Sequence, residues 1–331
     1  MKDVMTVTGP VPAESLGMTL MHEHVLISMP GDHLDPASTW SRAQCVDTAV
    51  TRMRELLEVG VRTFVDPCPV ELGRDPVLLR EVSERSGMQI VCATGFYMEQ
   101  DGFGIPYYWR QRYAEEIAEF YLHEIEHGIG DSGVRPGVIK LATSDPVGFH
   151  EPKVMAAAAI ASRESGLPVI THTENSVGGE IQLEALLGGG VPAGRCLIGH
   201  QDQQADLARL ATIAEAGASI GIDRVGLSTL VPDTVRADTV AALVAQGLTG
   251  RICLSQDHAC SIRSARPTRW VPKNRLEEYW RDIHPRLMTD MVDRSHTYLF
   301  TDFLPMLRER GVPEAAVTTM LVDNPRRIFT S

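Results

Sequence analysis

The feature that most constrains this chain is a regular alternation of short apolar runs with helical patterns. Eight apolar runs of strand length lie between residues 18 and 258, and segments with apolar residues at helical spacing separate them. Such alternation is typical of parallel β/α units, and eight units close a barrel. We therefore predict an α/β fold, the (β/α)8 TIM barrel. An open doubly wound sheet is the alternative, but no G-x-G-x-x-G motif follows the first run.

The predicted elements cover most of the chain as one domain, residues 1–331. Strands are predicted at 18–27, 61–67, 88–95, 137–144, 167–174, 195–202, 218–225 and 251–258. Helices are predicted at 46–59, 75–86, 110–127, 152–165, 179–187, 204–216 and 234–246, and again at 295–310 and 313–329.

Two further segments have a less regular pattern. Residues 5–17 are predicted to pair as a hairpin through Gly9 and Pro10. Residues 258–294 form a long insertion of mixed charge after the last strand. Long insertions in compact domains are usually functional, so we interpret this one as a lid or binding loop.

The composition limits what the chain binds. A formal net charge of −12 argues against nucleic acid or an anionic membrane as partner. It says little about a small-molecule substrate, the partner that we expect. No apolar run approaches the roughly 20 residues of a membrane helix, and the first residues lack signal-peptide features, so we expect a cytoplasmic protein. The six cysteines contain no C-x-x-C pair, which indicates neither a disulfide framework nor a thiolate zinc site.

Polar residues at the ends of the apolar runs indicate one site, because a (β/α)8 barrel carries its active site at the carboxyl ends of its strands. His22 and His24 are two residues apart and point to the same face of a strand, while Glu23 between them points away and is expected to be structural. The later strand ends carry Lys140, His172, His200 and Asp257. Imidazole and carboxylate donors suit zinc, cobalt, manganese or iron.

Each of these residues also has a simpler explanation. A single histidine at a strand end is commonly part of a structural hydrogen bond, and Asp257 alone fits a helix cap or turn. Lys140 within an apolar strand is harder to explain, because a buried lysine without a partner is costly. The shared position of all six residues favours one common metal site.

These residues resemble the binuclear metal site of the phosphotriesterase family, within the amidohydrolase superfamily. The resemblance extends over nearly the whole chain, through GMTLMHEH, VDP, ATGFY, EIEHGIG, GIDRVG and MLVDNPRRIF. It is strongest to the branch that contains phosphotriesterase-like lactonases and phosphotriesterase-related proteins.

The resemblance implies two divalent metal ions, with zinc favoured over cobalt, manganese or iron. Lys140 would react with CO2 to give N6-carboxylysine, a carbamate that bridges both ions. His22, His24 and Asp257 would hold the more buried ion, and His172 and His200 the more exposed one. A bridging hydroxide would be the nucleophile, and Asp257 would pass its proton to the leaving group. The family also implies a homodimer.

Three residues are predicted to bind substrate. Tyr97, in ATGFY, matches a tyrosine that orients the lactone in the lactonase branch, and Arg224, in GIDRVG, matches an arginine of that branch. We assign both a catalytic role as well. Trp270, in the insertion after the last strand, is the third.

The chain departs from the family pattern at two places. Family members commonly place an acidic residue shortly after the position of His200, and Asp202 is the candidate here for continuing the proton relay. The insertion carries Arg263, Arg266 and Arg269 where an acyl-homoserine lactone would require an apolar channel. These arginines are candidates for binding an anionic substrate, although arginines on a long loop are commonly solvated.

We therefore predict a metal-dependent hydrolase that opens lactones and carboxylic esters, with phosphotriester hydrolysis as a secondary activity. An amidohydrolase of small N-acyl compounds is one alternative. A metal-containing barrel that binds ligands without catalysis is another, and turnover of a substrate panel distinguishes it from the two enzymes.

Overall fold

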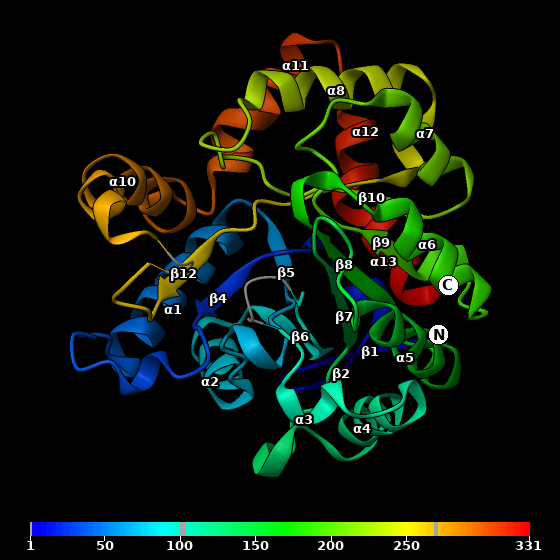
Figure 1. The fold of residues 1–331 in the computed structure, drawn as a ribbon. Coiled ribbons are helices and arrows are strands. Elements are labelled where there is room, and N and C mark those ends of the chain that lie inside the picture. Colours follow the sequence, from blue (N-terminus) through cyan, green and yellow to red (C-terminus); the bar gives the residue numbers. More distant parts are fainter. Residues whose placement is uncertain (1, 100–103, 268–270) are drawn as a thin grey trace.

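The computed structural model describes residues 2–99, 104–267 and 271–331. Its core is a parallel sheet of eight strands in the order β11-β10-β9-β8-β7-β6-β5-β3, which curves into a barrel with helices around it (Figure 1). The strands are β3 (Met18–Leu20), β5 (Val61–Asp66), β6 (Gln89–Gly95), β7 (Val138–Thr143), β8 (Val169–Thr173), β9 (Cys196–Ile198), β10 (Ser219–Ile222) and β11 (Ile252–Leu254). The predicted (β/α)8 barrel is confirmed, and the doubly wound alternative is wrong.

Helices follow the strands as the apolar spacing predicts. They are α1 (Arg42–Glu58), α2 (Pro76–Ser86), α4 (Ala114–His127), α5 (Glu151–Ser165), α6 (Gly179–Gly188), α7 (Leu207–Glu215) and α8 (Asp233–Ala245). Local signals set their ends: the Ser41 side chain accepts a hydrogen bond from the N–H of Gln44 at the start of α1, and Gly87 ends α2 with φ of 83°. None of the described helices is long and apolar enough to cross a membrane.

The predicted N-terminal hairpin is present, but its turn is elsewhere. β1 (Asp3–Thr6) and β2 (Gly9–Pro12) pair antiparallel with Thr6 opposite Gly9, so the turn is Val7 and Thr8. The Thr6 hydroxyl donates to the Gly9 carbonyl at 2.6 Å, which holds this tight turn. The glycine and proline therefore lie inside β2 rather than at the turn.

One apolar cluster joins the barrel strands to the N-terminal hairpin and to the last helix. Inward-facing residues of the strands, such as Val65, Val91 and Ile170, pack together with Val4 of the hairpin. Phe329 of α13 (Asn324–Thr330) joins the same cluster. The two ends of the described chain consequently lie side by side, as Figure 1 shows.

The barrel closes between its first and last strands, each of which has two parts. β4 (His24–Ile27) continues the first strand beyond β3, and β12 (Ala259–Ile262) continues the last strand beyond β11. β4 and β12 pair in parallel, with Ala259 opposite His24. Between these parts, the Asp257 N–H donates to the His22 carbonyl at 3.0 Å and the His24 N–H donates to the His258 carbonyl at 2.8 Å.

The insertion at 258–294 therefore differs from the predicted loop. Its first residues form β12 in the barrel wall, and much of the remainder is helical, including α9 (Leu276–Glu278) and α10 (His284–Met288). Hydrogen bonds hold it at both ends. Arg263 donates to Asp32 at 2.7 Å, and the Thr229 N–H donates to Asp290 at 2.6 Å.

Glu23 connects the first and last strands through its side chain. Its Oε1 accepts hydrogen bonds from the Ser255 hydroxyl at 2.9 Å and the Gln256 N–H at 2.7 Å, and its Oε2 accepts one from the His258 N–H at 3.1 Å. The residue is fully buried, and burial raises its pKa to about 8. Three donors offset the cost of burying this carboxyl group.

Replacing Glu23 by alanine should destabilise the fold. The change leaves two buried backbone N–H groups and one hydroxyl without an acceptor, which costs on the order of 2–4 kcal/mol in free energy of unfolding. Chemical denaturation followed by circular dichroism measures it. Glu314→Ala, at an exposed surface ion pair, should change that free energy by less than about 0.5 kcal/mol. Equal effects of the two substitutions would contradict the role of Glu23.

Candidate functional site

The six predicted ligands lie together at the carboxyl end of the barrel. They come from the junction of β3 with β4, from β7 and β8, from the segment after β9, and from the junction of β11 with β12: His22, His24, Lys140, His172, His200 and Asp257. All six are buried. The ring centroid of His200 lies 4.5 Å from that of His22 and 4.6 Å from that of His172. Strands that are distant in sequence therefore contribute to one cluster.

Asp257 lies at the centre of this cluster. Its Oδ1 is 3.1 Å from His24 Nε2 and 3.8 Å from His22 Nε2, and its Oδ2 is 3.8 Å from His200 Nε2. Lys140 Nζ lies 3.1 Å from His22 Nε2. Two ligand atoms that bind one zinc ion at about 2.1 Å each are about 3.0–3.5 Å apart. The donors and their spacing therefore fit a site for divalent metal ions.

The backbone is unusual at two of these residues. His200 and Asp257 both have φ of 56°, in the left-handed region that residues other than glycine seldom adopt. Hydrogen bonds hold both conformations, since the His200 N–H donates to Asp223 and the Asp257 N–H donates to the His22 carbonyl. Such conformations are common at functional sites.

Burial favours the uncharged forms of His22, His172 and Lys140, whereas at His24 the effect of burial is outweighed by Cys68, Asp257 and Asp66, which raise its pKa well above the usual value. Burial lowers the pKa of His22 and of His172 to about 4, and that of Lys140 to about 8. A neutral imidazole is the form that binds a metal ion. A neutral amine is likewise the form in which a lysine can react with CO2.

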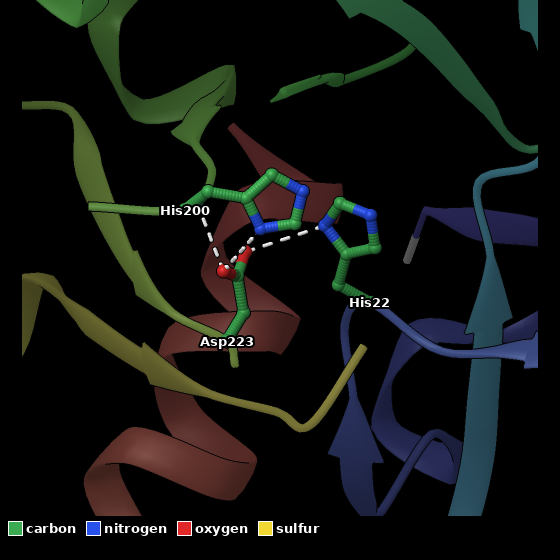
Figure 2. Close-up of side chains that lie close together, drawn as sticks. All are labelled: His22, His200 and Asp223. Carbon is green, nitrogen blue, oxygen red and sulfur yellow. Dashed lines mark hydrogen bonds and ion pairs between the residues drawn. The ribbon is translucent and has the colours of Figure 1, made fainter. Parts of the chain in front are cut away.

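Asp223 is a site residue that the sequence reasoning missed. Its Oδ1 lies 2.8 Å from His200 Nδ1 and its Oδ2 lies 3.3 Å from His22 Nδ1, so one carboxylate contacts both rings (Figure 2). A sequence signal was present, because Asp223 directly follows the apolar run of β10. The sequence analysis assigned a role to its neighbour Arg224 but none to Asp223.

Asp66, the last residue of β5, and Cys68, two residues after it, were also missed. The Cys68 Sγ lies 3.1 Å from His24 Nδ1, and Asp66 Oδ1 lies 3.6 Å from the same nitrogen. Asp66 Oδ2 accepts a hydrogen bond from the Val25 N–H at 2.8 Å. These two residues fix His24 from the side opposite to Asp257.

His172 directs its Nε2 atom, rather than its Nδ1 atom, toward an acidic side chain outside the predicted ligands, unlike His22, His24 and His200. Its Nε2 lies 3.2 Å from Glu174 Oε2, and the Tyr97 ring packs edge-on against it at a centroid distance of 5.0 Å. Arg224 Nε donates to Asp257 Oδ2 at 3.0 Å. Two of the three predicted substrate residues, Tyr97 and Arg224, therefore touch predicted ligands, and the third, Trp270, lies outside the described residues.

The structure gives other candidates different partners. Arg263 and Arg266 form ion pairs at 2.7 Å with Asp32 and Asp35, respectively. These carboxylates balance the positive charges that would otherwise attract an anionic substrate. Arg269 lies outside the described residues.

Asp202 is also engaged elsewhere. Its Oδ2 accepts hydrogen bonds from Arg236 Nε at 2.7 Å and from the Arg224 N–H at 3.1 Å. Arg236 is fully buried, so the two side chains form an internal ion pair. This geometry fits a structural role for Asp202 better than a proton relay.

A cavity of about 690 Å3 lies next to this site. The segments after β4, β5 and β6 line it, with Ser28, Glu71 and Arg110 among its residues. None of the six predicted ligands lines the cavity. The candidate metal site is therefore defined by the cluster of six predicted ligands and not by this cavity.

Comparison with known proteins identifies the family to which this chain belongs. The sequence profile of the phosphotriesterase family matches residues 2–329. An aryldialkylphosphatase of Saccharolobus solfataricus is 31% identical over 325 residues, which cover 97% of each chain. An N-acetyltaurine hydrolase of Salmo salar is 25% identical over 99% of this chain and 97% of its own length. The solved structure of a mutant phosphotriesterase-like lactonase of Deinococcus radiodurans superposes with a TM-score of 0.87, at 36% identity over 98% of this chain and 99% of that chain.

Replacing Lys140 by alanine should remove bound metal. We expect about two divalent ions per chain in the unmodified protein and well below one in the variant, because a bridging carbamate would be lost. Elemental analysis after gel filtration measures this content, and added propionate should restore part of it. Lys273→Ala, at an exposed position, is the control. Unchanged metal content in Lys140→Ala would rule out the bridging role.

Proposed function

This chain belongs to the phosphotriesterase family and is a hydrolase, and we propose that it cleaves the ester bond of lactones and other carboxylic esters. The observation that carries the proposal is the pair of contacts that Tyr97 and Arg224 make in the cluster. Tyr97 packs against His172, and Arg224 donates to Asp257. These contacts support a substrate-binding role for both residues beside the predicted ligands.

The proposed enzyme depends on two divalent metal ions. His22, His24, Lys140 as its carbamate, His172, His200 and Asp257 would hold them, and bound ions would polarise the acyl carbonyl and activate water. Zinc is the metal that we propose first, because nitrogen and oxygen donors at this spacing suit it.

Asp257 is the proton carrier in this proposal. Burial alone would raise the pKa of Asp257, but the neighbouring histidines and Arg224 hold it well below its usual value, so the group is an ionised carboxylate, which is the form that can take up a proton. As water adds to the acyl carbon, its proton passes to Asp257. The acyl–oxygen bond then breaks, and the proton passes to the departing alkoxide, which gives a hydroxy acid from a lactone.

Arg224 and Tyr97 have distinct proposed roles. Arg224 is buried beside Asp257, where its positive charge stabilises negative charge that develops in the transition state. Tyr97 orients the acyl group against His172. These roles need only groups that already contact the cluster.

One observation favours esters over amides, although an N-acetyltaurine hydrolase is among the relatives. An amine leaving group needs a strong proton donor, and a second acid near Asp257 would help to supply it. Asp202, the candidate, is neutralised by Arg236. A lactone needs only the proton that Asp257 carries. We propose phosphotriester hydrolysis as a weaker second activity, because it uses the same polarised oxygen.

A substrate panel tests the proposal. Metal-loaded protein is assayed with lactones, aryl esters, N-acyl amino acids and a dialkyl aryl phosphate, with metal-free protein as the control. We expect the highest kcat/KM for a lactone or ester. A higher value for the N-acyl compounds would support the amidohydrolase instead, and no turnover of any member would leave only the ligand-binding barrel.

Tyr97→Phe should separate the substrate classes. We expect kcat/KM to fall about tenfold for lactones, through the loss of one hydrogen bond, and to change little for the phosphotriester. Initial rates on both substrates measure the effect. Tyr107→Phe, at a side chain that is 79% exposed, should leave both rates unchanged. Equal losses on the two substrates would remove the orienting role of Tyr97.

We also propose a homodimer. Tyr107, Tyr113 and Phe149 expose apolar rings, and Lys153 of α5 connects their segments by donating to the carbonyls of residues 110 and 112. Light scattering should give about twice the chain mass of 36.3 kDa. The double variant Y113D/F149D should shift the protein toward monomer, and a monomeric unmodified protein would refute the proposal.

A further inference from the structure

The predicted histidine ligands are held from behind by acidic or thiol groups, and one of these groups is shared. Asp223 contacts the Nδ1 atoms of His22 and His200 with its two oxygens (Figure 2). His24 has Asp66 and Cys68 at its Nδ1, and His172 has Glu174 at its Nε2. The sharing at Asp223 connects a predicted ligand of the buried ion with one of the exposed ion.

We infer that Asp223 is a positioning residue that couples the two metal sites. The inference rests on the proposed metal-dependent function. A metal-binding histidine usually donates its other N–H to a carboxylate, which fixes the tautomer and orientation of the ring. Asp223 does this for His22 and His200 at once, so the ligand geometry at each ion depends on the same side chain.

The surroundings hold the Asp223 carboxylate in one place. It is buried, and its Oδ1 also accepts the His200 backbone N–H at 2.8 Å. A Cβ atom at Gly221 would lie 2.4 Å from its Oδ2, so glycine is required there for the carboxylate to fit. Among the described residues, its ion pairs are with the two histidines alone. The two rings are therefore the side chains that hold this carboxylate within the part of the chain that the structure describes.

The orientation of the rings distinguishes positioning from direct ligation. His22, His200 and Asp223 offer atoms close enough to hold an ion themselves. However, the Nδ1 atoms face Asp223, while the Nε2 atoms face Asp257 and Lys140 on the other side of the rings. An ion at Asp223 would take the nitrogens that must carry the hydrogen-bonding protons. The geometry thus assigns Asp223 a place behind the ligands.

Glu174 offers a contrast within the same site. Its Oε2 lies 3.2 Å from His172 Nε2, a predicted ligand of the more exposed ion, so we expect its effect to be strongest at that ion. Asp223 should affect both ions. This difference yields a test that general damage to the fold would not imitate.

The test is a titration of metal-free protein with Co2+ in bicarbonate buffer, followed by the visible absorption bands of the bound ion. We expect Asp223→Asn to weaken both binding steps by about 10- to 100-fold, the usual effect of such partners, and Glu174→Gln to weaken one. Asp233→Asn is the matched control, because Asp233 is a buried carboxylate that pairs with Arg236 and contacts no predicted ligand. It should leave both steps unchanged.

Several outcomes would overturn the inference. If Asp223→Asn keeps its circular dichroism spectrum and weakens one step or none, Asp223 does not couple the sites. If it loses one ion and binds the other with unchanged affinity and spectrum, Asp223 is a ligand. Lactone turnover is assayed on the same unmodified sample, so a protein that binds two ions without turnover refutes the proposed function and leaves this inference standing.

A second measurement avoids substitution, in case Asp223→Asn does not fold. Nitrogen-15 NMR of histidine side chains in the zinc-loaded protein reports which ring nitrogen carries a proton. His22 and His200 should be protonated at Nδ1, with the chemical shift of a strong hydrogen bond to a carboxylate. Metal-bound or unprotonated Nδ1 atoms at these two residues would overturn the inference.

Discussion

The contact between the first and last strands is the constraint on which the site depends. Glu23 draws the segment 255–258 against the first strand, and backbone hydrogen bonds on each side of Glu23 complete the closure. The same few residues carry His22, His24 and Asp257. The contacts that close the barrel therefore also bring half of the predicted metal ligands together. A substitution that disrupts these contacts should displace His22, His24 and Asp257.

Much of the fold and part of the site could be predicted from the sequence, because both follow from local patterns. Apolar runs gave the strands, and the period of two placed His22 and His24 on one face. β12 was missed because the polar segment Gln256–His258 interrupts the apolar pattern of the last strand. Asp223 and Cys68 were missed because their contacts cross between strands, and the partners of Arg263 and Arg266 lie more than two hundred residues away.

The charges of the site explain why a lysine belongs in it. Arg224 and Lys140 bring two positive charges into the unmodified cluster, where the carboxylates of Asp66, Glu174, Asp223 and Asp257 lie against the predicted ligands. In our proposal, carboxylation turns the Lys140 cation into an anion. Burial lowers the pKa of His22 and of His172 to about 4, so these two rings add no positive charge near neutral pH. One covalent change would thus remove a positive charge from the cluster and add a negative one, which strengthens its attraction for divalent cations.

The part of the insertion that follows β12 is a place where the length of the chain can vary between related barrels. Its ends are held to the rim by Arg263 with Asp32 and by Asp290 with the Thr229 N–H, so its length adds little to the constraints on the strands. Doubling the length of a closed loop costs only about 0.6 kcal/mol in chain entropy. Natural variation can therefore lengthen, shorten or replace the middle of this segment at small thermodynamic cost. The segment can change in this way while the predicted metal ligands stay fixed.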